Sequence, residues 1–185
     1  MYMDTHCHIT MNDYDDIPSL IDKIKDSGVS KIIVNGCDMQ SNIEVLELVK
    51  KYDIVYGSLG FHPTELDDFN DEYLSWLDEH IDDEKIVALG EIGLDYHYDN
   101  TDKNKEIDVF RKQLNIAKKH NKPVIVHSRE CIQDTYDILK VSNVEGIMHC
   151  YSGCCSVAVR KGWKQCKWKN IGKQLLYYIL FYCCY

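Results

Sequence analysis

Short apolar, β-branched runs alternate along this chain with segments of helical periodicity. The runs centre on six positions about 29 residues apart: Asp4, Ile33, Tyr56, Ala88, Ile125 and Met148. Alternation of this kind is typical of a parallel sheet with crossover helices. A closed (β/α)8 barrel needs about 250 residues, and this chain has 185. We therefore predict an α/β fold of the (β/α)8 TIM-barrel type that is incomplete, with about six βα units and the last two strands missing.

Five helices are expected between and after these strands. In the first, Ile17, Leu20, Ile21 and Ile24 follow an i, i+3, i+4, i+7 pattern that ends at Gly28. The segment 41–44 reads as a capping box that opens the second helix. The other three are predicted over 70–79, from about 107 to an end near 121–123, and from just after 129 to about 139. These helices supply the crossovers that parallel strands require.

The charge of the chain divides near residue 153. The formal net charge is −9, but residues 154–185 hold six basic residues and no acidic one, so they carry +6 and residues 1–153 carry −15. Such a shift marks a boundary. We predict a partial barrel over 1–153 and a divergent basic tail, rich in cysteine and aromatic residues, over 154–185. No secretion signal or bilayer-spanning run is recognisable, so we expect a cytoplasmic or nuclear protein with no membrane partner.

Five side chains that can bind metal lie where predicted strands end: His6, His8, Glu91, His127 and His149. In a parallel barrel these ends form one rim, and active sites lie on it. The spacing of His6 and His8 directs both imidazoles to the same face of a strand. Residues far apart in the sequence are therefore expected to converge at the rim.

Imidazoles and a carboxylate suit Zn²⁺, Mn²⁺ or iron, and a bridging glutamate can hold two ions about 3.5–4 Å apart. Taken singly, each histidine fits an ordinary surface or core position equally well. Taken together, the five residues favour a metal site. Two-metal sites stabilise attacking and leaving oxygens, which suits the hydrolysis of a phosphodiester, a phosphotriester or an amide.

Other residues are expected near the same rim. Arg129 follows His127 by two positions, and its planar guanidinium suits a phosphate oxygen, although a surface ion pair explains it equally well. Phe61 and Tyr96 follow the third and fourth strands, where they would either stack a base or pack into the core. The net acidity of the chain argues against a broad basic footprint for nucleic acid.

Five motifs occur in order along residues 1–153: Asp4-Thr5-His6-Cys7-His8, Gly60-Phe61-His62-Pro63, Gly90-Glu91-Ile92-Gly93-Leu94-Asp95-Tyr96, Pro123-Val124-Ile125-Val126-His127-Ser128-Arg129 and His149-Cys150-Tyr151-Ser152-Gly153. With these motifs the chain resembles the TatD family of metal-dependent deoxyribonucleases, within the amidohydrolase-like barrels. The resemblance implies an imperfect TIM barrel that hydrolyses the phosphodiester bonds of DNA, often as an exonuclease, by means of metal-activated water.

The resemblance also implies roles for individual residues. It implies two divalent ions, Mg²⁺, Mn²⁺ or Zn²⁺, with Glu91 bridging them. The metal ligands would be His6, His8, Glu91, His127 and His149. Catalysis would involve Glu91, His127 and Arg129, and the DNA substrate would be contacted by His62, Asp95 and Arg129.

One element of the family pattern has no counterpart. The family has a late strand whose aspartate binds metal and activates water, but no Asp or Glu follows Glu145. We expect the chain to leave the family's sequence at or just after Gly153, through a frameshift, a retained intron or a faulty gene model, rather than through a genuinely divergent tail. Two alternatives to an impaired DNase stay open: an amidohydrolase acting on a cyclic amide or ester, and a catalytically inactive fragment. Glu91 in place of a carbamylated lysine favours the DNase.

Overall fold

The structure of the protein is a computed structural model that describes residues 2–149. Within these residues six strands alternate with helices, at the positions that the sequence predicts. The elements are β1 (Tyr2–Cys7), α1 (Ile17–Asp26), β2 (Val29–Asn35), α2 (Met39–Lys51), β3 (Val55–Leu59), the 3-10 helix η1 (Pro63–Glu65), α3 (Asp71–His80), β4 (Ile86–Asp95), α4 (Lys103–Lys119), β5 (Val124–Arg129), α5 (Ile132–Ser142) and β6 (Gly146–Met148).

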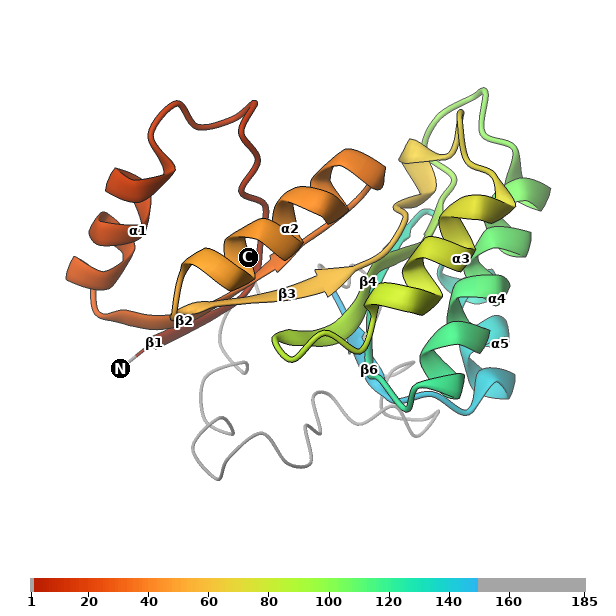
Figure 1. Cartoon of the computed structure of the whole chain (residues 1–185). Helices are drawn as coiled ribbons and strands as arrows, with labels where there is room; N and C mark the ends of the chain where they lie inside the picture. The colour runs from red at the N-terminus through yellow and green to blue at the C-terminus, as the bar shows by residue number, and fades with distance from the viewer. Residues whose placement is uncertain (1, 150–185) are drawn as a thin grey trace.

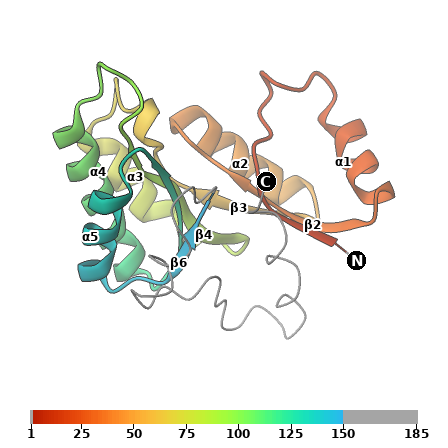
Figure 2. The ribbon, with the colours of Figure 1, turned by 180° about the vertical axis from the view of Figure 1, so that it is seen from behind.

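The strands form one sheet in the order β1-β2-β3-β4-β5-β6, and every neighbouring pair is parallel. The sheet curves, with α2 over β2 and β3 and with α3, α4 and α5 gathered beside β4, β5 and β6 (Figures 1 and 2). This arrangement confirms an incomplete barrel of the (β/α)8 type. The tail predicted over 154–185 lies outside the described residues. Among residues 2–149, no helix has the length and apolar character needed to cross a membrane.

Successive residues of the strands pack on opposite faces of the sheet. Ile32 and Val34 belong to the main core between the sheet and the helices, whereas Ile33 packs with Ala88 and Ile125 in a separate cluster. Since strand side chains alternate, this smaller cluster lines the concave face. His127 follows Ile125 by two positions on β5, so its side chain also faces the concave side.

The second helix begins earlier than the sequence pattern predicts. Asp38 is its N-cap: the carboxylate accepts a hydrogen bond from the Ser41 amide at 2.7 Å, and the Ser41 hydroxyl accepts one from the Asp38 amide at 3.0 Å. Ser41 is thus the third residue of the first turn rather than the cap, and the predicted capping box at 41–44 is wrong. The aspartate takes the capping position because its carboxylate already satisfies the amide of Ser41.

Buried amide side chains hold the loop that follows β3. The Asn42 side chain donates to the Gly60 carbonyl at 2.8 Å and accepts from its amide at 3.0 Å. Gln113 of α4 does the same for Phe61, at 3.0 and 2.8 Å. Phe61 is only 1% exposed and packs against Phe69. Core packing, and not base stacking, is therefore its role.

Removing the Gln113 amide should loosen this loop measurably. Gln113→Ala leaves the buried N–H and C=O of Phe61 without partners, at a cost of about 1–3 kcal/mol for each group. We expect the free energy of unfolding in urea to fall by about 2–6 kcal/mol. The matched control Gln133→Ala changes an exposed glutamine of α5 and should alter stability by less than about 0.5 kcal/mol. Equal effects of the two substitutions would contradict this account of the loop.

Candidate metal centre

Glu91 lies on the concave side of the sheet because β4 is irregular. Leu89 and Ile92 both pack in the main core on the helix side, although strict alternation would put residues three apart on opposite faces. The pairing of β4 with β5 shifts register between these two residues. The extra residue behaves as a β-bulge, which re-aims a side chain. The strand then continues to Asp95, so the prediction that it ends at Glu91 is wrong.

Two glycines allow β4 to approach β5 at this point. A Cβ atom on Gly90 would lie 2.7 Å from the Cβ of Ile125, and one on Gly93 would lie 2.0 Å from the carbonyl oxygen of His127. Gly93 also has φ +149°, a backbone conformation that residues with a side chain rarely adopt. The close approach of the two strands brings Glu91 and His127 side by side at the rim.

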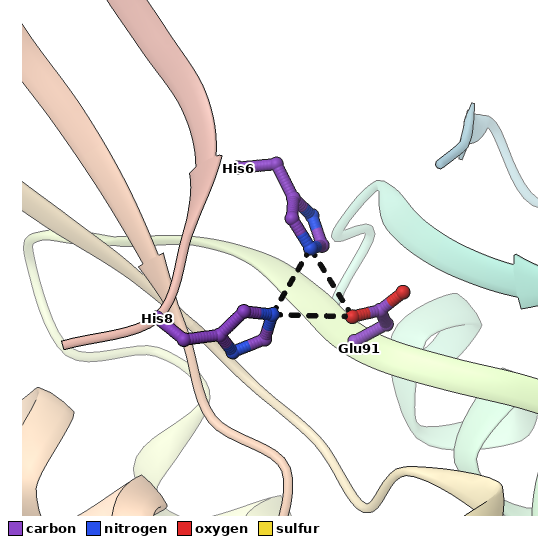
Figure 3. A group of neighbouring side chains, drawn as sticks. All are labelled: His6, His8 and Glu91. Atoms are coloured by element: carbon purple, nitrogen blue, oxygen red, sulfur yellow. Dashed lines mark hydrogen bonds and ion pairs between the residues drawn. The ribbon is translucent and has the colours of Figure 1, made fainter. Parts of the chain in front are cut away.

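The first ligand group consists of His6 of β1, His8 just after this strand, and Glu91 of β4. Nε2 of His6 lies 3.2 Å from Oε2 of Glu91, and Nε2 of His8 lies 3.6 Å from the same oxygen. The two histidine nitrogens are 3.1 Å apart. Figure 3 shows the three side chains pointing toward one another. The arrangement confirms that the His-x-His spacing directs both rings to one face.

The second ligand group uses the other oxygen of the same carboxylate. Nδ1 of His127 lies 3.4 Å from Oε1 of Glu91. His62, on the loop after β3, completes this group, whose ligand atoms all lie within 4.8 Å of one another. Glu91 is therefore shared by two clusters of imidazoles, one on each oxygen. The family resemblance implies substrate contact for His62 and does not predict its place beside Glu91 and His127.

In three of these histidines one ring nitrogen is held by the protein. Nδ1 of His8 lies 3.1 Å from the Asn35 carbonyl oxygen, and Nδ1 of His62 lies 2.8 Å from the hydroxyl of Thr64. Nε2 of His127 lies 2.9 Å from Oδ2 of Asp95. Metal-binding histidines typically have their second nitrogen engaged in this way, which fixes the orientation of the ring.

The electrostatics of the centre follow from the burial of Glu91, which is 3% exposed. Burial acts to raise the pKa of this carboxyl, but the close imidazoles of His127, His6 and His8 outweigh it and hold the pKa far below its usual range. Contacts with Cys37 and Glu91 raise the pKa of His8 to about 10, whereas burial lowers that of His62 to about 4. The neighbouring imidazoles thus stabilise the anionic form of one buried carboxylate.

The donor set fits divalent cations. Imidazole nitrogens and a carboxylate are the ligands that Zn²⁺, Mn²⁺ and iron prefer. Nδ1 of His6 and Oε1 of Glu91 are buried without a hydrogen-bond partner among the described residues. Such atoms are rare unless an ion or water satisfies them. The residues of both groups could therefore hold metal with little rearrangement.

Three other residues assigned from the sequence differ in their surroundings. His149 stacks on the ring of His6, with centroids 3.6 Å apart, but belongs to neither ligand group found within residues 2–149. Asp95 is buried and faces His127. Arg129 is exposed at the end of β5, with its guanidinium 5.8 Å from the centre of the Tyr98 ring. The roles of His149 and Arg129 stay predictions.

A curved parallel βα sheet with clustered metal ligands at its rim defines a metal-binding barrel protein of the (β/α)8 type. The family model described as TatD related DNase matches residues 3–165, and the chain belongs to this family. The match continues past residue 153, the predicted end of the barrel segment.

Two similar proteins are named only as metal-dependent hydrolases. The chain is 40% identical to "Uncharacterized metal-dependent hydrolase YabD" of Bacillus subtilis over 85% of its own length and 64% of that protein. It is 35% identical to "Uncharacterized metal-dependent hydrolase MJ1582" of Methanocaldococcus jannaschii, covering 94% of this chain and again 64% of the relative. The chain thus spans just under two thirds of the length of these relatives.

Solved structures agree with the fold. The crystal structure of YjjV, a TatD homolog from Escherichia coli K12, is similar with a TM-score of 0.76 and 32% identity, over 86% of this chain and 64% of that one. A hydrolase of the TatD family from Entamoeba histolytica has a TM-score of 0.77 over 89% of this chain and 64% of that one. At 23% identity, the second similarity supports the fold alone.

Substitution of the shared carboxylate should remove metal from both groups. We expect Glu91→Gln to weaken the binding of Mn²⁺ and Zn²⁺ by at least about 100-fold, because even residues that only support a ligand contribute about 10–100-fold. His62→Ala should weaken one binding step and leave the other. Isothermal titration calorimetry on the full chain measures both. The exposed Glu79→Gln on α3 is the control, and a Glu91→Gln chain that binds metal as the wild type does would contradict the assignment.

Proposed function

We propose that this chain is a metal-dependent deoxyribonuclease that hydrolyses phosphodiester bonds of DNA from an end of the strand. One observation carries the proposal: the buried carboxylate of Glu91 lies between two groups of imidazoles, at 3.2 Å from His6 on one oxygen and 3.4 Å from His127 on the other. Such a ligand set suits two divalent ions, Mg²⁺, Mn²⁺ or Zn²⁺. The membership of the TatD related DNase family supports the choice of DNA as substrate.

Bound divalent ions would supply Lewis-acid stabilisation of a phosphoryl oxygen and would lower the pKa of water. The chain's own residues prepare the site for them. Asp95 holds the ring of His127, and the Asn35 carbonyl holds that of His8. Arg129, exposed two residues beyond His127 on the same strand, would bind a phosphate of the DNA through its planar guanidinium.

Two features bear on the alternatives. The fourth strand contributes Glu91 to the centre, and a glutamate cannot form the carbamylated lysine ligand that would favour a cyclic amide as substrate. The late aspartate that the resemblance implies for the activation of water has no counterpart within residues 146–185, which contain no acidic residue. Loss of a general base typically costs about 10²–10⁴-fold in rate. We therefore propose an impaired nuclease rather than an amidohydrolase.

The test is a nuclease assay on the full 185-residue chain. Single-stranded and double-stranded DNA labelled at one end would be incubated with Mg²⁺, Mn²⁺ or Zn²⁺, and with EDTA. We expect slow, metal-dependent release of mononucleotides from an end. Parallel reactions with RNA and with a cyclic amide separate the candidate substrates.

His127→Ala should abolish this activity, since it removes a ligand that faces Glu91. The matched control is His80→Ala, which removes a histidine that stacks on Trp76 of α3, and it should leave the rate unchanged. No difference between the wild type and His127→Ala, with any of the three ions, would reject catalysis by this chain. A metal-bound but inactive wild type would instead identify it as an inactive fragment.

A further inference from the structure

Glu106 is a buried carboxylate outside both ligand groups. It lies in the first turn of α4, is 5% exposed, and its Oε2 accepts a hydrogen bond from the Asp95 amide at 2.8 Å. Burial, together with the nearby charge of Asp95, raises its pKa to about 7. A carboxylate in such a position costs stability, so the contact that it makes at the end of β4 needs an explanation.

Asp95 is held at all of its polar atoms. Its amide binds Glu106, and its carbonyl oxygen accepts a hydrogen bond from the hydroxyl of Thr101 at 3.2 Å. Of its carboxylate oxygens, Oδ1 accepts from the His97 amide at 3.0 Å, and Oδ2 lies 2.9 Å from Nε2 of His127. The aspartate therefore has one orientation, which directs Oδ2 at the histidine ring.

The ring of His127 completes the connection to the metal centre. Because Nε2 is held by Asp95, Nδ1 is the nitrogen that faces Oε1 of Glu91, at 3.4 Å. A rotation of this ring would withdraw Nδ1 from Glu91 and from the second ligand group. The orientation of one ligand thus depends on a chain of contacts that begins on the helix that follows β4.

We propose that Glu106 is a positioning residue of the metal centre: it fixes the backbone of Asp95 and, through Asp95, keeps Nδ1 of His127 directed at Glu91. The effect of Glu106 on the orientation of the His127 ring can be tested without any enzymatic activity. Its effect on hydrolysis rests on the proposed function. Residues that orient a ligand in this way typically contribute about 10–100-fold to metal affinity.

The first test is spectroscopic and uses the metal-free full chain. A side-chain Nε2–H of His127 bonded to Asp95 should give a slowly exchanging imidazole signal in ¹H–¹⁵N NMR spectra, assigned by its absence in His127→Gln. Glu106→Ala should lose this signal or broaden it. Glu106→Gln should retain it, because the amide oxygen can still accept the hydrogen bond from the Asp95 backbone.

Glu44→Ala is the matched control. Glu44 is equally buried at 5%, lies on α2, and accepts a hydrogen bond from the Met11 amide at 2.9 Å in another rim loop. Its loss should lower stability without affecting the His127 signal. If Glu106→Ala fails to fold, Glu106→Asp supplies the same test, since the shorter side chain cannot reach the amide. A signal retained in both of these variants, or lost equally in Glu44→Ala, would overturn the proposal.

The second test measures metal affinity in a double-mutant cycle. Glu106→Ala and Asp95→Asn should each weaken the binding of Mn²⁺ by about 10–100-fold, and the double variant should be no weaker than Asp95→Asn alone, because Glu106 acts through Asp95. If the fold-losses of Glu106→Ala and Asp95→Asn multiplied in the double variant, Glu106 would not act through Asp95. A chain without nuclease activity in which the His127 signal still depends on Glu106 would refute the proposed function and leave this inference standing.

Discussion

The burial of one carboxylate constrains the whole centre. Glu91 is turned to the concave face by the irregularity in β4, and its pKa stays low because His127, His6 and His8 surround it. An isolated carboxylate in such a place would be strongly unfavourable. The same histidines that stabilise the anion in the metal-free protein are the ligands that would hold a cation beside it. The irregularity that buries Glu91 therefore also places it among its candidate partner ligands.

Side chains of two helices hold the loops that carry the ligands. In each case a buried polar group of α2 or α4 binds backbone atoms at the end of a strand or in the loop after it, where ladder hydrogen bonds are no longer available. The pairs are Glu44 with Met11, Asn42 with Gly60, Gln113 with Phe61, and Glu106 with Asp95. The rim is thus built on the rigid outer layer of the half-barrel, as the precise placement of ligands requires.

The strand positions and most ligands could be predicted because both follow from local patterns. The six apolar runs indicate the strands, and His6 and His8 reveal a shared face by their spacing. The bulge at Glu91 could not be predicted, since it depends on how β4 pairs with β5. The place of His62 in a ligand group was missed for a similar reason: it lies on a loop whose course is set by Asn42 and Gln113, far away in the sequence.

Metal binding and hydrolysis place different demands on this chain. Both ligand groups lie within the described strands and their loops, because they use residues from β1 and the position just after it, β4, β5 and the loop after β3. The resemblance to the family implies a water-activating aspartate from a later strand, and residues 146–185 contain no acidic residue. The two properties should therefore be separable by experiment: the affinity for divalent ions depends on contacts within the described residues, whereas the proposed hydrolysis depends in addition on how water is activated.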